Sequence, residues 1–532
     1  MKAPMSSTLN CLAAALCATL LTPAVAQKAG GVLRVYERDS PPSASIHEEG
    51  TSSTLVPFMP LFNNLVLFDQ HAKRNEPGNI RGDLAQQWAW SADATVLTFK
   101  LTPGVKWHDG KPLTSADVKC TWDTLAGKRD AGWRKSPRSG WYSNLEEVTI
   151  NGDLEVAFKL KRPQPSFLSF LASGLSPVYP CHVDGRTMRT APIGTGPFKL
   201  AEFRSGEVIR LTRNPDYFKK GKPLLDGIEY RIIPNQATRL MSFIAGDLDM
   251  TWSDVNAEME KDVRRQQPKA ICEMTVKPTG GLVLANSKNE ALKDPRFRRA
   301  LALAIDRKSI DAITAQGKGA ATGIMMAPPD GAWGLTAAQL ADVAGYGKDV
   351  AKNREAARKL MSELGYSAAK PLQLKMMVVN RPNQTVPTVL LIDQLRSINI
   401  AASMDAVDIG VWSQRLTRRA DFELSYESHA PALDDPDVVL YQGYKCGASA
   451  NYGDYCSKET DALIDEQSAT TDPVKRRKLV QTIDHKLQSE GVRPVFHVTY
   501  SGYCRYPAVK GIDHPTNSIY NSYRYEDAWL DH

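Results

Sequence analysis

The chain has 532 residues, of which 42% are hydrophobic, 8% aromatic and 23% charged. These proportions are typical of a globular protein and exclude a mainly disordered, collagen-like or coiled-coil chain. The 66 lysines and arginines exceed the 59 acidic residues by only seven. Since no dense basic run is present to follow a phosphate backbone, nucleic acid is not an expected partner.

The first 26 residues have the pattern of an export signal. Lys2 precedes an apolar stretch from Cys11 to Leu21, which is too short for a permanent membrane span. Ala24-Val25-Ala26 supplies the small residues that a signal peptidase needs. We therefore expect cleavage after Ala26 and export to the periplasm, with a short buried helix as the alternative. Neither Cys11 nor Cys17 follows the small residue of a lipoprotein signal, which favours an unanchored product.

Cleavage would leave six cysteines in an oxidising compartment, where cysteines are disulfide candidates. Cys446 and Cys456 form the best pair, because the segment between them contains Gly, Ser and Asn and can turn back on itself. The other four allow three complete pairings that the sequence does not rank; they are Cys120, Cys181, Cys272 and Cys504. Zinc is the competing interpretation, but Cys-x-x-Cys pairs with nearby histidines are absent, so we expect no metal and no other cofactor.

Strand patterns dominate the first part of the mature chain. Val32–Tyr36 is typical of a first strand. Thr95–Leu101 alternates apolar and polar residues, as a half-buried strand does. Gly104–Leu113 is expected to be a strand broken at an Asp-Gly turn, after which Thr114 or Ser115 caps a helix. The apolar face of that helix carries Val118, Trp122 and Leu125.

Strands and helices alternate in the rest of the chain. Strand patterns lie at Val208–Leu211, Ile228–Ile233, Leu372–Val379 and Phe422–Ser425. Helices are expected from Asp294-Pro295 onward, at about Val350–Leu364 and at Thr388–Ser397. Such alternation predicts layered α/β lobes.

Recognised catalytic motifs are missing from the sequence. His47-Glu48-Glu49 lacks the second histidine of a metalloprotease helix. Gly194-Thr195-Gly196 has the start of a dinucleotide-binding loop, but Pro197 and a strand pattern follow it, so a turn is the better interpretation. An exported hydrolase stays an alternative because catalytic carboxylates need not be adjacent in sequence, and a holdase-like or surface interaction protein is another.

Several segments, in order, resemble family 5 of the extracellular solute-binding proteins, the dipeptide- and oligopeptide-binding group of ABC importers. The most specific one runs from Gly82-Asp83-Leu84-Ala85 to Asp123. The others follow in the expected order and are Gly194–Phe198, Arg213–Tyr217, Ala245–Asp249, Asp294–Asp306 and Ala356–Tyr366. The resemblance implies an α/β, two-lobed periplasmic-binding-protein fold with an extra subdomain in lobe one.

The same resemblance implies where the lobes begin and end. Lobe one would take residues 27–73, 191–282 and 496–532, with an inserted subdomain at 74–190, and lobe two would take 283–495. The chain then crosses between the lobes twice. Thr279-Gly280-Gly281 is a candidate hinge, because Gly280 and Gly281 could absorb the backbone rotation of closure; a plain turn is the alternative.

The function implied by the resemblance is that of a monomeric periplasmic receptor without enzymatic activity. A small-molecule ligand (a peptide, an opine-like conjugate or another organic solute) would be held between the lobes and passed to the transmembrane subunits of an ABC permease. Ligand contacts both lobes only when they are closed, so it shifts the population toward the closed form.

Ligand identity depends on a few positions. Arg381-Pro382 stands where dipeptide-binding relatives hold the peptide carboxylate, and a guanidinium suits that group; a solvated surface arginine is the alternative. Aligning on Asp435-Pro436-Asp437 puts His429 at the relatives' tryptophan and Ala432 at their ammonium-binding aspartate. Asp434 is a candidate replacement for that aspartate, or a turn residue. A carboxylated solute is therefore expected, though not a peptide bound in the usual way.

Aromatic residues supply further candidates for the wall of the cleft. These are Trp252, Trp412 and Tyr426, each with core packing as the alternative. His429 could hydrogen-bond the ligand or respond to pH.

Overall fold

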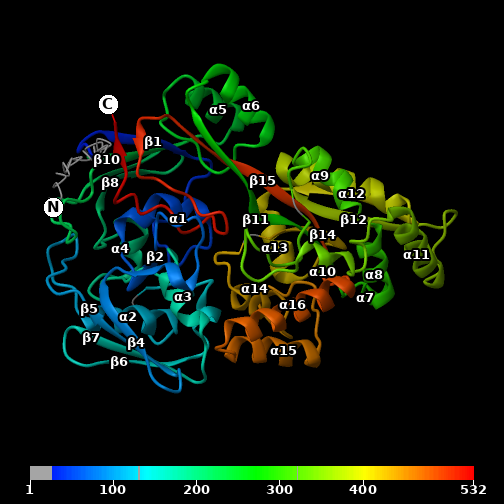
Figure 1. Cartoon of the computed structure of the whole chain (residues 1–532), viewed down its shortest axis with the longest axis horizontal. Coiled ribbons are helices and arrows are strands. Elements are labelled where there is room, and N and C mark those ends of the chain that lie inside the picture. Colours follow the sequence, from blue (N-terminus) through cyan, green and yellow to red (C-terminus); the bar gives the residue numbers. More distant parts are fainter. Residues whose placement is uncertain (1–26, 130–131, 320, 430, 532) are drawn as a thin grey trace, which may run out of the picture.

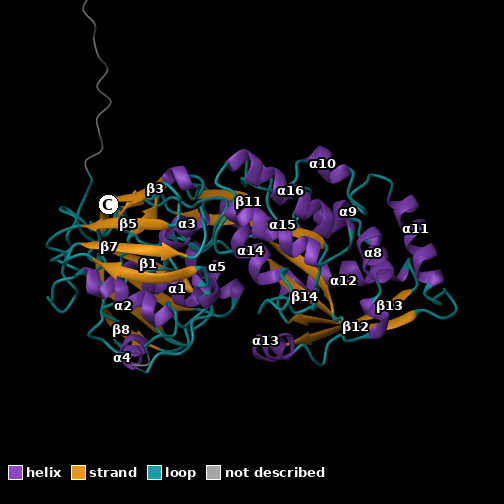
Figure 2. Cartoon of the chain, turned by 90° about the horizontal axis from the view of Figure 1, so that it is seen from below, coloured by secondary structure: helices purple, strands orange, loops and turns teal. Residues whose placement is uncertain are grey.

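The computed structural model describes residues 27–129, 132–319, 321–429 and 431–531. Two lobes lie side by side, with the first on the left of Figure 1 and the second on the right. Sheets and helices occur in both lobes (Figure 2), which confirms the predicted α/β class. The predicted signal peptide, residues 1–26, lies outside the described residues. Within those residues, none of the helices has the length and apolar character that a bilayer span requires.

The first lobe contains a sheet with the strand order β1-β10-β9-β8. Its strands are β1 (Val32–Glu37), β8 (Phe198–Arg204), β9 (Val208–Arg213) and β10 (Gly227–Ile232). β1 pairs with β10 in parallel, whereas the other neighbours are antiparallel. The strands predicted at 32–36, 208–211 and 228–233 are therefore confirmed.

A second sheet, with the order β4-β5-β7-β6, forms the extra subdomain of this lobe, below the first sheet in Figure 1. Its strands are β4 (Ala85–Trp90), β5 (Val96–Leu101), β6 (Leu145–Ile150) and β7 (Glu155–Leu160). Helix α2 (Ser115–Leu125) contacts β6 and β7. Thr114 is its N-cap, and Asp117 accepts a 2.9 Å hydrogen bond from the backbone N–H of Thr114, which completes a capping box.

The segment Gly104–Leu113 has the predicted turn at Asp109-Gly110, but it does not form the predicted strands on either side of that turn. Within it the structure shows turns and a single bridge between Lys106 and Pro112. Gly104 and Gly110 have φ values of 76° and 89°. Because a strand requires negative φ at each residue, two such glycines bend this short segment too strongly for a continuous ladder.

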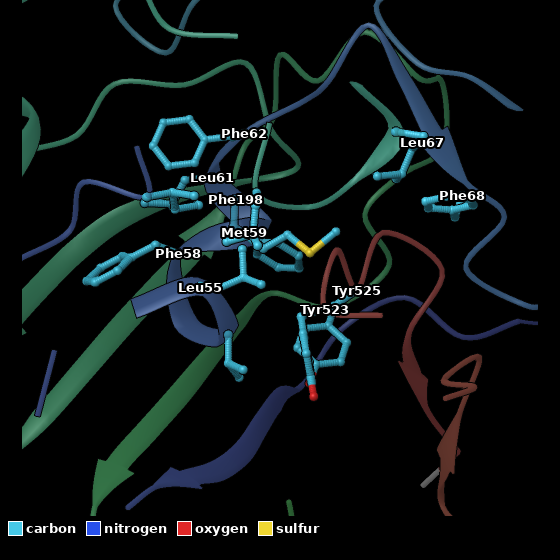
Figure 3. Close-up of a cluster of buried hydrophobic side chains, with 14 of the residues drawn as sticks. Leu55, Phe58, Met59, Leu61, Phe62, Leu67, Phe68, Phe198, Tyr523 and Tyr525 are labelled. Carbon is cyan, nitrogen blue, oxygen red and sulfur yellow. The ribbon is translucent and has the colours of Figure 1, made fainter. Parts of the chain in front are cut away.

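The core of the first lobe joins distant parts of the sequence (Figure 3). Helix α1 (Ser52–Phe58) and the short 3-10 helix η1 (Met59–Leu61) bury side chains against Phe198 of β8 and against Tyr523 and Tyr525 near the C-terminus. Arg524, between those tyrosines, is fully buried and forms a 2.8 Å ion pair with the buried Asp83. The end of the chain is therefore a structural part of lobe one.

Several shorter elements complete the first lobe. Its remaining helices are α3 (Ser166–Ala172), α4 (Gly185–Thr190), α5 (Gln236–Ile244), α6 (Ala257–Gln266), η2 (Pro77–Asn79) and η3 (Ser139–Tyr142). Its short strands pair as β2 (Val66–Phe68) with β3 (Ile80–Gly82), and as β16 (Val509–Lys510) with β17 (Trp529–Leu530).

Two long antiparallel strands, β11 (Ile271–Ala285) and β15 (Val495–Arg505), run from the first lobe into the second. In the second lobe they join a sheet with the order β13-β12-β14-β11-β15. The other strands of that sheet are β12 (Leu372–Val379), β13 (Ile400–Val407) and β14 (Leu424–His429). The register between β11 and β15 shifts between Val276 and Gly280 and again between Gly281 and Leu282.

Helices cover this sheet and form the rest of lobe two (Figure 1). They are α7 (Glu290–Lys293), α8 (Pro295–Ala304), α9 (Arg307–Thr314), α10 (Ala337–Ala341), α11 (Val350–Glu363), α12 (Pro382–Arg396), α13 (Ile409–Arg418), α14 (Pro436–Gly443), α15 (Lys458–Ala469) and α16 (Pro473–Ser489). The helix expected at 388–397 begins earlier, at Pro382, because a proline is well accommodated in the first helical turn.

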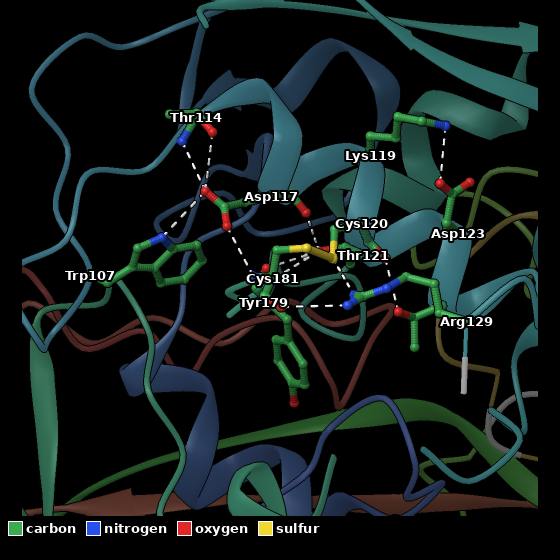
Figure 4. The surroundings of a disulfide bond; sticks show 11 residues. Trp107, Thr114, Asp117, Lys119, Cys120, Thr121, Asp123, Arg129, Tyr179 and Cys181 are labelled. Carbon is green, nitrogen blue, oxygen red and sulfur yellow. Dashed lines mark hydrogen bonds and ion pairs between the residues drawn. A yellow bond between two sulfur atoms is a disulfide. The ribbon is translucent and has the colours of Figure 1, made fainter. Parts of the chain in front are cut away.

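Disulfides pair all six cysteines of the described chain. Cys446 is joined to Cys456, as the sequence favours. Cys272 and Cys504 stand opposite each other on β11 and β15 and are joined. Cys120 of α2 is joined to Cys181, whose backbone N–H donates 2.9 Å to Asp117 on the same helix (Figure 4). Reducing conditions would therefore act on both lobes and on the strands between them.

Candidate functional site

A cavity of about 270 Å³, here called the interlobe cavity, lies between the two lobes. Arg138, Trp141 and Tyr520 line it from lobe one, and Glu427, Tyr444 and Arg493 are among the residues that line it from lobe two. Since pockets for drug-sized ligands span about 300–1,000 Å³, this cavity suits a small solute.

Glu427 and Arg493 form a buried ion pair on the lobe-two side of the cavity. Glu427 lies on β14, and Arg493 stands two residues before the first residue of β15. Oε1 of Glu427 is in contact with Nη2 of Arg493, whose Nη1 donates 2.7 Å to the carbonyl oxygen of Gly443. Burial by itself would lower the pKa of Arg493, but the Glu427 carboxylate outweighs it and the net shift is upward. The guanidinium of Arg493 therefore stays charged.

Four buried polar atoms on the cavity residues have no hydrogen-bond partner within the described chain. They are Nε1 of Trp141, Oε2 of Glu427, the hydroxyl oxygen of Tyr444 and Nε of Arg493. A buried polar atom without a partner costs about 1–3 kcal/mol, and more where the group is charged. The residues that carry these four atoms line the cavity, but each of the four atoms is itself buried.

Arg138 brings a further positive charge from lobe one. Nη1 of its guanidinium donates 2.8 Å to the carbonyl oxygen of Glu49, and Nη2 donates to that of Ile46. Burial lowers the pKa of Arg138. Its charge thus meets backbone carbonyl oxygens rather than a carboxylate, and the cavity has two arginines for one glutamate.

Beside the cavity, the lobes touch through the buried carboxylate of Asp437 on α14. Ser166 at the start of α3 donates 2.6 Å to its Oδ2, and Gln164 donates 3.0 Å to the same oxygen. From lobe two, Gln467 and Ser468 of α15 donate at 2.6 and 2.8 Å. These contacts hold the lobes together on the side away from β11 and β15 (Figure 1), so this is a closed arrangement.

Asp434, a predicted ligand residue, is turned toward a different cavity of about 20 Å³ that Lys277 also lines. Its Oδ2 accepts 2.8 Å from the backbone N–H of Ala332 and 3.2 Å from the side chain of Asn517. Burial raises the pKa of Asp434 to about 7. Ala432, by contrast, lines the interlobe cavity and brings no carboxylate to it.

Arg381 lies at the boundary of the lobes but does not line the interlobe cavity. It is the N-cap of α12, and its Nη2 is 3.7 Å from Oδ1 of Asp39 in lobe one. That distance is too long for a hydrogen bond, and 36% of the Arg381 side chain is exposed. The guanidinium is thus accessible and only loosely paired.

The predicted aromatic residues occupy three different surroundings. Trp252 is buried, and the guanidinium carbon of Arg38 lies over its ring, 4.4 Å from the ring centre. Nε1 of Trp252 has no hydrogen-bond partner among the described residues. Trp412 donates 3.2 Å to the hydroxyl of Ser425, behind the sheet of lobe two. Tyr426 belongs to the lobe-two core, and its hydroxyl lies 2.9 Å from Nε2 of His497. The three side chains therefore do not share one wall.

Gly280 and Gly281 lie in β11, at the irregular stretch of the strand. A Cβ atom on Gly280 would lie 2.4 Å from the carbonyl oxygen of His497, and one on Gly281 would lie 2.6 Å from the ring of Phe496. Close packing against β15 therefore requires glycine at both positions. The backbone of His429 pairs with Gly280, while the side chain of His429 lies outside the described part of the structure.

Sequence analysis did not single out Glu427 of the cavity wall, although this residue stands on β14 between Tyr426 and His429, which were both predicted ligand residues. Trp141, Tyr444 and Arg493 gave no comparable signal, because each comes from a different segment. As for a metal, no group of three or more His, Cys, Asp or Glu side chains in the described ranges is placed to hold one.

Comparisons with known proteins agree with this architecture. The family model described as bacterial extracellular solute-binding proteins, family 5 middle, matches residues 79–451. The probable di/tripeptide-binding protein 5 of Pseudomonas aeruginosa is 26% identical over 466 residues, which cover 82% of this chain and 85% of that protein.

Solved structures agree in fold. The oligopeptide-binding protein AppA from Bacillus subtilis, in complex with a nonapeptide, has a TM-score of 0.79 at 22% identity and covers 95% of this chain and 100% of its own. The binding protein AgaA from A. tumefaciens R10, in complex with agropinic acid, has a TM-score of 0.78 at 22% identity, with 94% and 99% covered. The two-lobed binding-protein fold is therefore established.

Proposed function

This chain belongs to family 5 of the bacterial extracellular solute-binding proteins, and on that premise we propose that it captures a small peptide-like or other organic solute for an ABC importer. Like its relatives, it is a solute-binding protein and not an enzyme. The proposed solute carries a carboxylate and is held between the lobes until the transmembrane permease takes it over.

The observation that carries the proposal is the interlobe cavity, which residues of both lobes line. Both lobes line it, so a ligand inside it would contact both of them and favour closure. The similarity to a di/tripeptide-binding protein supports a ligand of that size class. A volume of about 270 Å³ suits a dipeptide or a smaller solute better than a long peptide.

Closure supplies the physical mechanism. A dissociation constant near one micromolar corresponds to about −8 kcal/mol of binding free energy. If most of it is realised only with both lobes in place, it drives the closed population, and the permease can recognise that shape. No covalent step is required, so the solute leaves unchanged. Gly280 and Gly281 are the proposed hinge of the motion.

The setting proposed for this function is the periplasm. Export with cleavage after Ala26 fits the family's extracellular character, and three disulfides suit an oxidising compartment. We expect a monomer. Arg381 lies outside the interlobe cavity, so we propose it as the group for the ligand's carboxylate in the case that the solute extends beyond that cavity; its loose contact with Asp39 leaves donors for an anion.

The test is a binding assay on the mature protein from residue 27. Amino acids, dipeptides, opine-like conjugates, other carboxylates and sugars are screened by thermal shift, and hits are titrated by calorimetry. We expect one class to saturate at one molecule per chain, to reduce the radius of gyration in scattering, and to be recovered intact by mass spectrometry. Turnover of the hit, or scattering profiles that superimpose with and without it, would contradict the proposal.

A further inference from the structure

The two strands that connect the lobes, here called the β11–β15 ribbon, are not paired along their whole length. Six consecutive pairs join Ile271–Val276 to Tyr500–Arg505, and pairing resumes only between Gly280 and Val498. Three residues of β11 therefore stand opposite Thr499 alone. A bulge of this kind leaves residues unpaired and bends the strand. The ribbon thus has a lobe-one stretch and a lobe-two stretch, with a bend between them.

The lobe-two stretch of β11 is held on both sides. Its residues Gly280–Ala285 pair with β14, and Gly280, Gly281 and Leu282 also pair with β15. Because β14 belongs wholly to lobe two, this stretch of β11 moves with that lobe.

The lobe-one stretch of β11 has a ladder on one side only. Within the described residues, β15 is the one strand that pairs with residues 271–276. β15 itself is fixed to lobe one: the backbone N–H of Thr251 donates 2.8 Å to the carbonyl oxygen of Cys504, and the N–H of Cys504 donates 2.8 Å to the hydroxyl oxygen of Thr251. A pair of strands without further neighbours is marginally stable in water. The lobe-one stretch of β11 therefore needs another attachment to stay in place when the lobes move.

The Cys272–Cys504 disulfide supplies that attachment. It joins β11 to the residue of β15 that Thr251 holds, and the side chain of Cys504 is fully buried in the lobe-one core. With the two strands joined there, the four pairs from Glu273 to Val276 close short loops, which costs little conformational entropy. The disulfide therefore keeps the whole lobe-one stretch of the ladder paired.

From this arrangement we infer that Cys272–Cys504 is a conformational clamp, which holds the lobe-one stretch of β11 to lobe one and confines bending of the ribbon to the interruption between Val276 and Gly280. The inference rests on the lobe motion of the proposed function and limits the range of that motion. Without the clamp, the ladder can separate back to Ile271, and the ribbon gains conformations in which the lobes lie further apart. The interruption directly precedes Gly280, a residue of the proposed hinge.

The test is small-angle scattering of the ligand-free mature protein, at a temperature where circular dichroism shows each variant to be folded. Cys272→Ser/Cys504→Ser should have a larger radius of gyration than the wild type, because its lobes open further. The matched controls remove disulfides that lie within a single lobe; they are Cys120→Ser/Cys181→Ser and Cys446→Ser/Cys456→Ser. Both controls should keep the wild-type radius. An unchanged radius in Cys272→Ser/Cys504→Ser, or an equal increase in all three variants, would overturn the inference.

A relocated disulfide keeps the test decisive if Cys272→Ser/Cys504→Ser does not fold. Val276 stands opposite Tyr500, four positions along the ladder from the native disulfide, so the side chains of this pair lie on the same face. The variant that also carries Val276→Cys/Tyr500→Cys should form the new disulfide and have the wild-type radius, because both disulfides lie on the lobe-one side of the interruption. A smaller radius would show that the ribbon bends between Cys272 and Val276, and a larger one that the clamp does not act through this ladder. Either result contradicts the inference.

These measurements use no solute, so they decide on the clamp separately from the binding panel. If no solute of that panel binds, the proposed function is overturned, whatever the scattering of the ligand-free variants shows. If the radii contradict the clamp while a solute binds and closes the lobes, the proposed function stands and the disulfide does not limit the motion.

Discussion

The hydroxyl of Ser166 in lobe one donates a 2.6 Å hydrogen bond to the buried carboxylate of Asp437 in lobe two. A hydrogen bond to a charged group contributes about 1.5–3 kcal/mol. Because the Ser166–Asp437 hydrogen bond joins the two lobes and is lost when they separate, it favours closure even before a ligand enters. The resting position of the lobes and the affinity for ligand are therefore coupled through Asp437.

The first prediction concerns this contact. Ser166→Ala should favour the open form by about 1.5–3 kcal/mol and weaken ligand binding by roughly 10–100-fold. Scattering of the ligand-free protein and calorimetry with the ligand found in the panel would measure both effects. Gln467→Met is the control, because it removes a donor to Asp437 from within lobe two. If Ser166→Ala leaves both the radius of gyration and the affinity unchanged, Asp437 does not hold the lobes together.

A second prediction ranks the disulfides. In the chain-entropy model a disulfide stabilises more when it closes a longer loop, and the sequence separations here are 232, 61 and 10 residues. The expected losses of unfolding free energy are about 5 kcal/mol for Cys272→Ser/Cys504→Ser, about 4 for the Cys120 pair and about 3 for the Cys446 pair. Urea unfolding of the three double variants gives the order, and a reversed order would contradict it.

The third prediction follows from Asp434. Burial raises its pKa to about 7, from 3.8. Between about pH 4 and pH 7 the folded state therefore keeps a proton that the unfolded state has released, so the free energy of unfolding falls as the pH rises through this window. The asparagine side chain in Asp434→Asn cannot ionise. This substitution should therefore remove up to about 4 kcal/mol of the fall in the free energy of unfolding.

Urea unfolding of the wild type and of Asp434→Asn at pH 4.5 and pH 7.5 would measure how much the free energy of unfolding falls between these two pH values. Asp393→Asn serves as the control, because Asp393 is an exposed residue on α12. The same pH dependence in wild type and Asp434→Asn would show that this carboxyl group does not titrate in the expected window.

Fourth, Gly196 is predicted to be intolerant of any side chain. A Cβ atom there would lie 2.3 Å from the carbonyl carbon of Leu61 and 2.4 Å from the carbonyl oxygen of Pro60. Gly196→Ala should cost roughly 3 kcal/mol of unfolding free energy, because backbone atoms cannot move aside cheaply. Gly140→Ala meets no atom within 4 Å and should change stability little. If Gly196→Ala and Gly140→Ala have equal midpoints in thermal unfolding, the close packing of Gly196 against the backbone of Pro60 and Leu61 does not limit this position to glycine.

The fifth prediction separates two roles of Arg381. If its guanidinium binds the ligand's carboxylate, Arg381→Ala should abolish binding, whereas Asp39→Ala should leave the affinity within about threefold. If it acts only through the 3.7 Å contact with Asp39, both variants should show the same small effect, since exposed ion pairs contribute about 0–1 kcal/mol. Calorimetry of the two variants decides between them.

Sequence patterns predicted the elements whose signals are local. Strand β12 coincides with the predicted 372–379, and α8 begins at Pro295 with Asp294 as its N-cap. Thr114, one of the two residues expected to cap helix α2, is its N-cap. Such features depend on residues a few positions apart, which is why one segment is enough to read them.

The cavity wall depends on relations that no single segment contains. Arg138, Glu427 and Arg493 come from three distant parts of the chain, and residues of both lobes line the cavity that they share. The orientation of Asp434 is likewise set by Ala332 and Asn517, far away in sequence. The unpartnered oxygen of Glu427 could not be inferred without these neighbours.

Tyr523, Arg524 and Tyr525 help to fill the middle of the first lobe, although the residues of lobe two separate them in sequence from most of that lobe. The first lobe therefore cannot be completed until the residues of lobe two have been synthesised. The half that is made first must wait for this late segment. A chain cut short before Tyr523 would leave the earlier half of the molecule without its centre.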